Sequence, residues 1–427
     1  MTILFVKPSK LKGEIELPAS KSHSIRAIIF ASLAKGKSKI DKLLDSPDIE
    51  NALKACQMMG AKVTYSDGPL EIEGTDGLFN SPEEEIDAGN SGQVLRFIGA
   101  IAALGEGVTT LTGDESIQTN RPVLPLLKAL RKLGAKAKSV EGNDCAPITI
   151  QGPAKAGVVS MDGEDSQPVS GILMLAAFLE GTTELNVKKP GEKPWIDLTL
   201  SWFEKMNIPF ENDRYRHYKI KGKNSIKAFN YTVPGDFSSA AFPAAAAFAT
   251  RSKVTLKNID MSDIQGDKKF FEALEKMGAK LEYDDSKKEM FVDGTQPLTG
   301  KELDVNDYID AITILAVLGC LAEGTTVLKN AAIARRKESD RIDCICKELQ
   351  KMNAEIEQTP DGLIIKKSQL KDATVDSHND HRIAMSLTIA GLAAEGSSII
   401  QDVECIKKSY PTFVEHLLHL GADIEVE

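Results

Sequence analysis

Two hydrophobic patterns alternate along the chain. In the first, apolar residues recur every three or four positions, a Gly or Asn follows, and a short alternation of polar and apolar residues comes next. This spacing predicts an amphipathic helix, a left-handed C-cap and a strand. The pattern occurs as KACQMMGAKVT (54–64), KALRKLGAKAK (128–138), SWFEKMNIPFE (201–211), EALEKMGAKLE (272–282), KELQKMNAEIE (347–357) and EHLLHLGADIE (415–425). The predicted caps are Gly60, Gly134, Asn207, Gly278, Asn353 and Gly421.

The second pattern is a helix-length run of small apolar residues, followed by a turn and a β-branched strand. It occurs as RAIIFASLAKGKSKI (26–40), VLRFIGAIAALGEGVTTL (94–111), SGILMLAAFLEGTTEL (170–185), SAAFPAAAAFATRSKVTL (239–256), AITILAVLGCLAEGTTVL (311–328) and RIAMSLTIAGLAAEGSSII (382–400). These runs are apolar on nearly every side, so the helices that they predict should be buried. The amphipathic helices should instead face solvent on one side.

Together the two patterns define a repeated unit of the form βαβαββ, with a period of roughly 70 residues. Three copies lie in each half of the 427-residue chain. A chain of this length is too long for a single hydrophobic core. We therefore expect an α/β protein of two similar domains, each a bundle of buried helices walled by sheets.

Composition narrows the class of function. The formal net charge of −10 excludes an overall basic surface for nucleic acid. The N-terminus has no apolar run of signal-peptide length, and no stretch of about 18 uninterrupted apolar residues occurs in the sequence, which predicts a cytoplasmic protein with no membrane association. The six cysteines form no CxxC pair and are expected to be buried. His378 and His381 have the spacing of two metal ligands but lack an evident third, so no metal is expected.

In the first half of the chain, polar motifs stand where the small-residue helices should begin. They are LPASKSHSIRA (17–27) with Lys21, Ser22 and Arg26, DAGNSGQVLRF (87–97) with a turn at Asn90, Ser91 and Gly92, and TNRP (119–122) with Arg121 before a proline that starts a helix. A helix N-terminus offers free amides to an anion, and the side chains add cations and a hydroxyl. The alternative for LPASKSHSIRA is a helix cap with solvated charges.

In the second half, the corresponding positions carry carboxylates as well as cations. They are VNDYIDA (305–311) with Asp310, RRKESDRI (335–342) with Lys337, Glu338 and Arg341 within about one helical turn, HNDHRIAM (378–385) with His381 and Arg382, and IKKSYPTF (406–413) with Lys407 and Lys408. The charge run RRKESDRI could instead be a salt-bridged helix face. If the helices of each domain point the same way, these motifs converge, which predicts an anion-binding cleft between the domains.

In order and along the whole chain, these motifs resemble the 5-enolpyruvylshikimate-3-phosphate synthase family. The matching segments are LPASKSHSIRA, GNSG, TNRP, DSQ (165–167), KPWIDLTL (193–200), VPGDFSSAAF (233–242), YIDA, RRKESDRI, NDHRIAM and KKSYPTF. The resemblance implies a two-domain inside-out α/β barrel, the enolpyruvyl transferase fold, with three βαβαββ repeats per domain. It places residues 1–19 plus 236–427 on the phosphoenolpyruvate side, residues 20–235 on the shikimate 3-phosphate side, and the active site between them.

The resemblance also implies an activity and a set of site residues. The activity is transfer of the enolpyruvyl group of phosphoenolpyruvate to the 5-hydroxyl of shikimate 3-phosphate, with release of phosphate, on the shikimate pathway to chorismate and the aromatic amino acids. It implies small-molecule substrates only, no metal or organic cofactor, and a monomer. The implied shikimate 3-phosphate contacts are Lys21, Ser22, Arg26, Ser166, Gln167, Asp310 and Lys337. The implied phosphoenolpyruvate contacts are Lys21, Gly92, Arg121, Arg341, Arg382 and Lys408, and the implied acid–base residues are Asp310 and Glu338, with Lys21.

The sequence departs from the family pattern at several of these positions. Asp165 and Glu192 stand where many members have serines that help to bind the shikimate phosphate. Carboxylates there should repel that phosphate unless neighbouring cations compensate or the acceptor differs. After the GNSG turn, Gln93 and Phe97 replace the more usual Thr and Pro.

Two other functions fit the same fold. One is the sister reaction, enolpyruvyl transfer to UDP-N-acetylglucosamine. Those enzymes carry a Cys in the loop before the first-domain Arg, whereas residues 113–122 have none, and Ser22 replaces their usual Asn. The other is a non-catalytic homologue that binds a metabolite. It would be expected to lose its acid–base residues, yet Asp310 and Glu338 are present.

Overall fold

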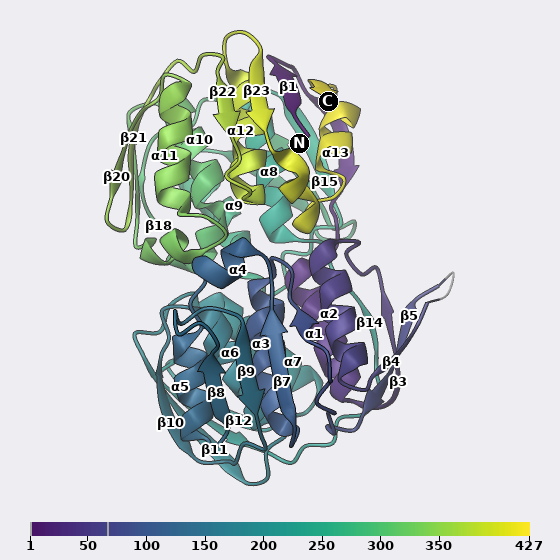
Figure 1. The fold of residues 1–427 in the computed structure, drawn as a ribbon. Coiled ribbons are helices and arrows are strands. Elements are labelled where there is room, and N and C mark those ends of the chain that lie inside the picture. Colours follow the sequence, from purple (N-terminus) through teal and green to yellow (C-terminus); the bar gives the residue numbers. More distant parts are fainter. Residues whose placement is uncertain (1, 66–67) are drawn as a thin grey trace. The chain divides into compact units, whose positions relative to one another are not determined.

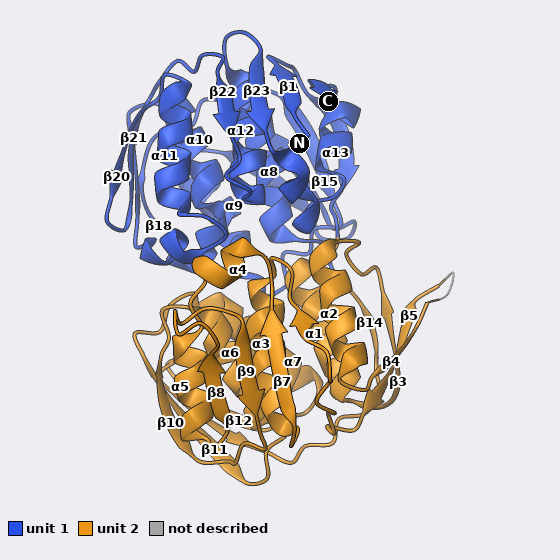
Figure 2. Cartoon of the chain, in the orientation of Figure 1, with its two compact units in different colours: residues 1–18, 234–427 blue, residues 19–233 orange. Residues whose placement is uncertain are grey.

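The computed structural model describes residues 2–65 and 68–427 (Figure 1). The chain divides into two compact units, coloured in Figure 2. Unit 1 consists of Met1–Pro18 and Pro234–Glu427, and unit 2 of Ala19–Val233. The chain therefore passes between the units twice, one to two residues before the positions expected from the sequence.

Among the described residues, each unit contains three four-stranded sheets. In unit 2 they are β14 (Asn230–Thr232), β3 (Lys35–Asp41), β5 (Leu70–Thr75), β4 (Lys62–Thr64); β6 (Ile86–Asp87), β7 (Val108–Thr112), β9 (Ile148–Gln151), β8 (Lys136–Ser139); and β10 (Val158–Asp162), β11 (Thr182–Lys188), β13 (His217–Lys221), β12 (Phe210–Asp213). In unit 1 they are β2 (Lys12–Glu16), β15 (Lys253–Lys257), β17 (Glu289–Asp293), β16 (Lys280–Asp284); β18 (Glu302–Asp304), β19 (Thr325–Lys329), β21 (Gly362–Lys366), β20 (Glu355–Thr359); and β22 (Thr374–Asp376), β23 (Ser398–Gln401), β1 (Leu4–Lys7), β24 (Asp423–Val426).

All six sheets have the same topology. The first two strands in each order are parallel and the remaining neighbours are antiparallel. A parallel pair needs a crossover, and a small-residue helix supplies it within a repeat, as α6 (Ser166–Ala176) does between β10 and β11. Where the chain leaves a unit, the edge strand is exchanged: β2 precedes α1 (Lys21–Leu33) but pairs with β15, and β14 precedes α8 (Phe237–Ala249) but pairs with β3. The six repeats predicted from the sequence are therefore confirmed.

The small-residue helices form the buried centre of each unit. They are α1 (Lys21–Leu33), α3 (Gly92–Ile101) and α6 (Ser166–Ala176) in unit 2, and α8 (Phe237–Ala249), α10 (Ile312–Leu321) and α12 (His381–Ala393) in unit 1. In α12, every residue from His381 to Leu392 is buried. All of these helices except α10 begin one to five residues before the apolar run, so polar motif residues form their buried first turns. This is what positions the candidate site.

The amphipathic helices cover the outer side of each repeat and end as predicted. They are α2 (Pro47–Met58), α5 (Leu124–Lys132), α7 (Lys193–Lys205), α9 (Lys269–Lys276), α11 (Arg341–Lys351) and α13 (Phe413–His419). All six predicted caps have positive φ, from 56° at Asn207 to 110° at Gly60. The remaining helices are α4 (Glu115–Thr119) and 3-10 turns at Ala102–Leu104, Gly266–Lys268, Asn306–Ala311, Ala332–Arg336 and Val403–Lys408.

Two expectations from composition can be compared with the structure. All six cysteines, Cys56, Cys145, Cys320, Cys344, Cys346 and Cys405, are buried and none is in a disulfide. Across residues 2–65 and 68–427, no helix combines the length and apolar character needed to cross a bilayer.

Candidate active site

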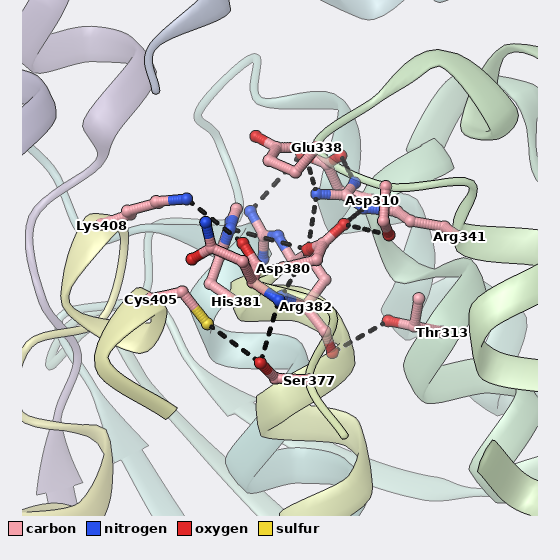
Figure 3. A network of polar contacts seen from close by, with 12 residues as sticks. Asp310, Thr313, Glu338, Arg341, Ser377, Asp380, His381, Arg382, Cys405 and Lys408 are labelled. Carbon is pink, nitrogen blue, oxygen red and sulfur yellow. Dashed lines mark hydrogen bonds and ion pairs between the residues drawn. The ribbon is translucent and has the colours of Figure 1, made fainter. Parts of the chain in front are cut away.

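A network of charged side chains in unit 1 is organised around one buried arginine (Figure 3). Arg341 begins α11 and is 1% exposed. Its guanidinium contacts three carboxylates: Nη1 lies 2.7 Å from Asp310 Oδ1, Nη2 lies 2.8 Å from Glu338 Oε2, and Nε lies 2.8 Å from Asp380 Oδ2. Each of the three guanidinium nitrogens of Arg341 therefore already contacts a carboxylate.

Asp380 joins the start of α11 to the start of α12. It is the N-cap of α12, where its side chain accepts a hydrogen bond of 2.9 Å from the backbone N–H of Arg382. It also accepts one of 3.1 Å from the Ser339 hydroxyl and is fully buried. The Asp380 carboxylate thus contacts the first turn of α12, Ser339 before α11, and the side chain of Arg341 at the start of α11.

Asp310 links Arg341 to a second buried arginine. Its Oδ2 lies 3.4 Å from Nη2 of Arg382, which projects from the first turn of α12. Arg382 also donates to the carbonyl of Ser238 at 3.0 Å and lies over the ring of Phe242 at 5.6 Å. Ser238 and Phe242 both belong to α8, so two buried helices, α8 and α12, meet the start of α11 and the turn before α10 at this point.

The electrostatics of this cluster keep both partners charged. Burial alone would lower the pKa of Arg341, but Asp380, Glu338 and Asp310 raise it well above its ordinary value. Burial alone would raise the pKa of Asp310, but Arg382, Arg341 and Lys337 together hold it well below its usual range. Asp310 is therefore an ionised carboxylate that points at two guanidinium groups.

The other predicted residues of unit 1 lie around this cluster. Lys337 is buried, and Lys408 Nζ donates to the carbonyl of Asn379, next to Asp380, at 3.3 Å. The expectation that Lys337, Glu338 and Arg341 share a helical turn is wrong. The helix starts only at Arg341, because Asp340 is its N-cap. Lys337 and Glu338 lie in the loop between the 3-10 turn and this helix.

The two spaced histidines have separate surroundings. His378 stands outside α12 at φ 52°, and its Nε2 lies 2.9 Å from Glu348 Oε1. His381 is the first residue of α12, with Nδ1 3.7 Å from Asp380 Oδ1. No group of three metal-ligating side chains occurs in the described part of the chain.

In unit 2, Arg26 occupies a different kind of environment. It is 2% exposed, and its guanidinium donates to the Thr199 hydroxyl at 3.0 and 3.1 Å, to the Ser22 carbonyl at 3.1 Å and to the Trp195 carbonyl at 3.3 Å. It lies over the ring of Phe97 at 4.9 Å. All of these contacts are neutral, and burial lowers the pKa of Arg26 to about 9. The arrangement leaves a cation that an anion would stabilise.

Gly92 is the point where two further arginines approach the backbone. A Cβ at this position would lie 2.7 Å from Nη2 of Arg121 and 2.7 Å from Nη1 of Arg96, so no larger residue fits without moving them. Arg121 donates to the carbonyl of Asn90 at 2.7 Å. The predicted turn before α3 is confirmed, with Ser91 as N-cap. The predicted helix after Arg121 starts later than expected, at Leu124, with a proline as its second residue.

Lys21 lies in the first turn of α1, and its Nζ is 3.1 Å from Asp48 Oδ2. Ser22, next to it, accepts a hydrogen bond of 3.0 Å from Gln93. Both departures after the GNSG turn therefore contact predicted site residues, Gln93 through Ser22 and Phe97 through Arg26.

The two carboxylates that depart from the family pattern both have partners. Asp165 Oδ2 lies 3.3 Å from Arg96 Nε, and Arg96 also donates to the Gln167 side chain at 3.2 Å. Glu192 is 1% exposed and accepts from the backbone N–H of Ser166 at 2.9 Å and from its hydroxyl at 3.1 Å. A neighbouring cation compensates Asp165, whereas the contacts of Glu192 with Ser166 are to neutral donors.

Sequence reasoning did not single out several residues of these clusters. Asp380 and Arg96 lie inside the motifs quoted above, and Asp48 lies outside them. The signal for Arg96 was available, since one arginine in an otherwise apolar buried helix needs a partner. No local pattern marks Asp48, which meets Lys21 only through the packing of α2 against α1.

Comparison with known proteins agrees with this architecture. The sequence model of the family described as EPSP synthase (3-phosphoshikimate 1-carboxyvinyltransferase) matches residues 6–417. Two relatives named 3-phosphoshikimate 1-carboxyvinyltransferase are similar over nearly their whole length. The relative from Acetivibrio thermocellus is 43% identical over 99% of both chains, and that from Chlamydia caviae is 42% identical over 98% of this chain and 94% of its own.

A solved structure of EPSP synthase from Acinetobacter baumannii is similar to this chain with a TM-score of 0.84, at 28% identity and with complete coverage of both chains. This similarity confirms the enolpyruvyl transferase fold. The chain therefore belongs to the EPSP synthase family and is a transferase that catalyses that family's 3-phosphoshikimate 1-carboxyvinyl transfer.

Proposed function

We propose that unit 1 holds phosphoenolpyruvate and supplies the acid–base carboxylates, while unit 2 holds shikimate 3-phosphate, in the synthesis of 5-enolpyruvylshikimate 3-phosphate for chorismate and the aromatic amino acids. The observation that carries this proposal is Asp310, an ionised carboxylate shared by Arg341 and Arg382. Two multiply charged anions must be brought together, and arginine forks are suited to phosphate and carboxylate groups.

The proposed division of binding follows the charges. Arg341, Arg382 and Lys408 receive the phosphate and carboxylate of phosphoenolpyruvate in unit 1. In unit 2, Arg26 and Ser22 with Ser166 and Gln167 receive shikimate 3-phosphate. Each unit is also assigned contacts with the other substrate. In unit 2, Lys21, Arg121 and the Gly92 amide are assigned to phosphoenolpyruvate, and in unit 1, Lys337 and Asp310 are assigned to the acceptor. Lys21 is assigned to the acceptor as well.

Asp310 is proposed to accept the proton of the 5-hydroxyl as that oxygen attacks C2 of phosphoenolpyruvate. In the ligand-free protein its lowered pKa makes it a weak base. A ligand anion that engages Arg341 and Arg382 neutralises the charges that lower this pKa, so the pKa rises and Asp310 becomes a stronger base. Ligand binding thus prepares the base for the step in which it is needed.

Glu338 is proposed to handle the C3 proton of phosphoenolpyruvate, with Lys21 as a further acid–base candidate. C3 gains a proton when the tetrahedral intermediate forms and loses one when phosphate leaves. Glu338→Gln should therefore slow deuterium exchange at C3 at saturating substrate. Normal exchange together with a raised KM for phosphoenolpyruvate would show that Glu338 only orients Arg341, which it contacts at 2.8 Å.

Phosphate release from phosphoenolpyruvate tests the proposed substrates directly. The full chain should release phosphate with shikimate 3-phosphate and not with UDP-N-acetylglucosamine. Release with the sugar nucleotide alone would overturn the proposal, and release with neither would indicate a non-catalytic homologue. We also propose that the protein acts as a cytoplasmic monomer, because one chain carries all of the assigned contacts. Sedimentation of the purified protein as a dimer would contradict the monomer.

A further inference from the structure

A second buried carboxylate lies behind the arginine cluster of unit 1. Asp267, in the 3-10 turn Gly266–Lys268, is 1% exposed, and its Oδ2 accepts a hydrogen bond from the Ser238 hydroxyl. Its Oδ1 has no hydrogen-bond partner among the described residues. Burying a charged carboxylate whose oxygen has no hydrogen-bond donor costs free energy. This cost favours the protonated form of Asp267.

The turn that carries Asp267 is fixed against the start of α8. Gln265 donates to the carbonyl of Gly235 at 2.9 Å and accepts from the backbone N–H of Phe237 at 3.2 Å. Ser238 then has two roles. Its hydroxyl binds Asp267, and its carbonyl accepts the hydrogen bond of Arg382 at 3.0 Å. One α8 residue therefore connects the buried carboxylate to the arginine assigned to phosphoenolpyruvate.

The groups that face Asp267 come from three neighbouring elements. They are Asp310 from the turn before α10, Arg382 from α12, and Asp236 and Ser238 from the start of α8. Burial, Asp310 and Asp236 raise the pKa of Asp267 to about 7, against the opposing effects of Arg382 and Ser238. The pKa of Asp310 is held low by the same arginine. Of the two carboxylates near Arg382, Asp267 is therefore the one that binds a proton near neutral pH.

Building on the proposed function, we propose that Asp267 is a positioning residue that takes up a proton when phosphoenolpyruvate binds Arg382. Ionised Asp267 competes with the ligand anion for the charge of Arg382, and protonation ends that competition. A ligand anion at Arg382 cancels the cationic charge that stabilises ionised Asp267. The Asp267 carboxylate then takes one proton from solvent and becomes neutral. Its hydrogen bond with Ser238 can still form.

Calorimetric titration of phosphoenolpyruvate into the full chain, in two buffers of different ionisation enthalpy, measures this proton. Wild type should take up more protons than Asp267→Asn at pH 7.5, with the difference approaching about 0.8 proton, and the two should agree at pH 5.5, where Asp267 is already protonated. Asp307→Asn is the matched control, because it removes a carboxylate from the neighbouring turn whose partner is Lys269 at the surface. It should behave as wild type.

Steady-state kinetics supply a second readout that a purely structural role would not change. Above pH 7 the wild-type KM for phosphoenolpyruvate should rise by up to about tenfold per pH unit, with a smaller change in kcat, whereas Asp267→Asn should show a flat KM. Asp267→Glu should restore the rise. Active wild type with the same proton uptake and KM profile as Asp267→Asn overturns the inference. Wild type with no phosphate release overturns the proposed function instead.

Ser238→Ala decides the question if Asp267→Asn does not fold. It keeps the backbone carbonyl that binds Arg382 but removes the hydroxyl whose hydrogen bond lowers the pKa of Asp267. The pH at which KM starts to rise should therefore move upward. An unchanged starting pH would contradict the proposal.

Discussion

Arg341 in unit 1 and Arg26 in unit 2 are both fully buried near the start of a helix, yet their environments are opposite. Arg341 contacts three carboxylates, whereas Arg26 contacts hydroxyl and carbonyl oxygens and an aromatic ring. A ligand anion that approaches Arg341 must compete with anions already present. One that approaches Arg26 meets a cation that has only dipoles to stabilise it. One of the two proposed anion-binding arginines is thus already surrounded by carboxylates, and the other is not.

Replacing each arginine by Met should separate these environments most strongly. Arg341→Met leaves the buried Asp380 and the partly buried Asp310 and Glu338 without their shared cation and should cost about 3–5 kcal/mol of folding stability. Arg26→Met leaves only neutral acceptors and should cost about 1–3 kcal/mol. Urea unfolding, with hydrogen exchange to report on each unit separately, measures both. Equal losses would mean that the carboxylates around Arg341 are not energetically coupled to it.

The next largest effect is expected on catalysis. Asp310→Asn keeps a side chain that can accept from Arg341 and Arg382 but cannot take the proton of the acceptor. Turnover should fall about 10²–10⁴-fold, with a much smaller change in the KM for shikimate 3-phosphate. Initial rates of phosphate release, with Asp307→Asn as the control, provide the measurement. A loss expressed mainly in KM would assign Asp310 to binding alone.

Local sequence patterns predicted the parts of this structure that local physics determines. Asn207 and Asn353 were expected at left-handed caps because a helix of the right period ends just before each, and both have positive φ. RRKESDRI shows where local reading stops. Of its two interpretations, the salt-bridged segment is supported by the ion pairs that the structure contains, whereas the binding motif stays a prediction. Arg341 points into the buried cluster, and Arg335 pairs with Asp340 at 2.8 Å.

Contacts between distant parts of the chain could not be read from one sequence. Asp380 meets Arg341 across 39 residues, and Asp267 meets Ser238 across 29. Both contacts depend on how the buried helices of the bundle are aligned, and the hydrophobic pattern constrains only which face of each helix is buried. The exchange of β2 and β14 between repeats has the same origin, since it follows from the path of the chain and not from strand propensity.

A substitution of Glu192 tests the proposed anion site in unit 2, where the described contacts of Arg26 are to neutral groups. Its carboxylate binds Ser166, one of the residues assigned to the acceptor, and adds negative charge there. Glu192→Gln keeps an oxygen that can accept from Ser166 and removes that charge. The KM for shikimate 3-phosphate should fall by about fivefold, equivalent to about 1 kcal/mol. Asp165→Asn should lower it less, because Asp165 is already paired with Arg96. A KM that rises in Glu192→Gln would show that the carboxylate helps to organise the site.

The smallest effect concerns a pair in unit 1 in which the partly exposed His378 contacts the buried Glu348. Hydrogen bonds with Cys344 and then Glu348 raise the pKa of His378 to about 10. Despite burial, hydrogen bonds from His378 and Lys351 lower the pKa of Glu348 to about 2. The His378 contribution to stability is complete below its unfolded pKa of 6.5 and is lost as pH rises toward 10. The Glu348 contribution is complete above 4.5 and is lost as pH falls toward 2.

The pair should therefore stabilise unit 1 most between about pH 4.5 and 6.5. His378→Gln should cost about 1 kcal/mol at pH 5.5, a modest value because the His378 side chain is 35% exposed, and less at pH 9.5. His416→Gln is an informative control of opposite sign. Burial lowers the pKa of His416, so its contribution is present above 6.5 and is lost as pH falls. Relative to wild type, the urea midpoint of His378→Gln should thus be lowered more at pH 5.5 than at pH 9.5. For His416→Gln the dependence on pH should be the reverse. A His378→Gln deficit that is independent of pH would mean that packing, and not the charged pair, accounts for its stability.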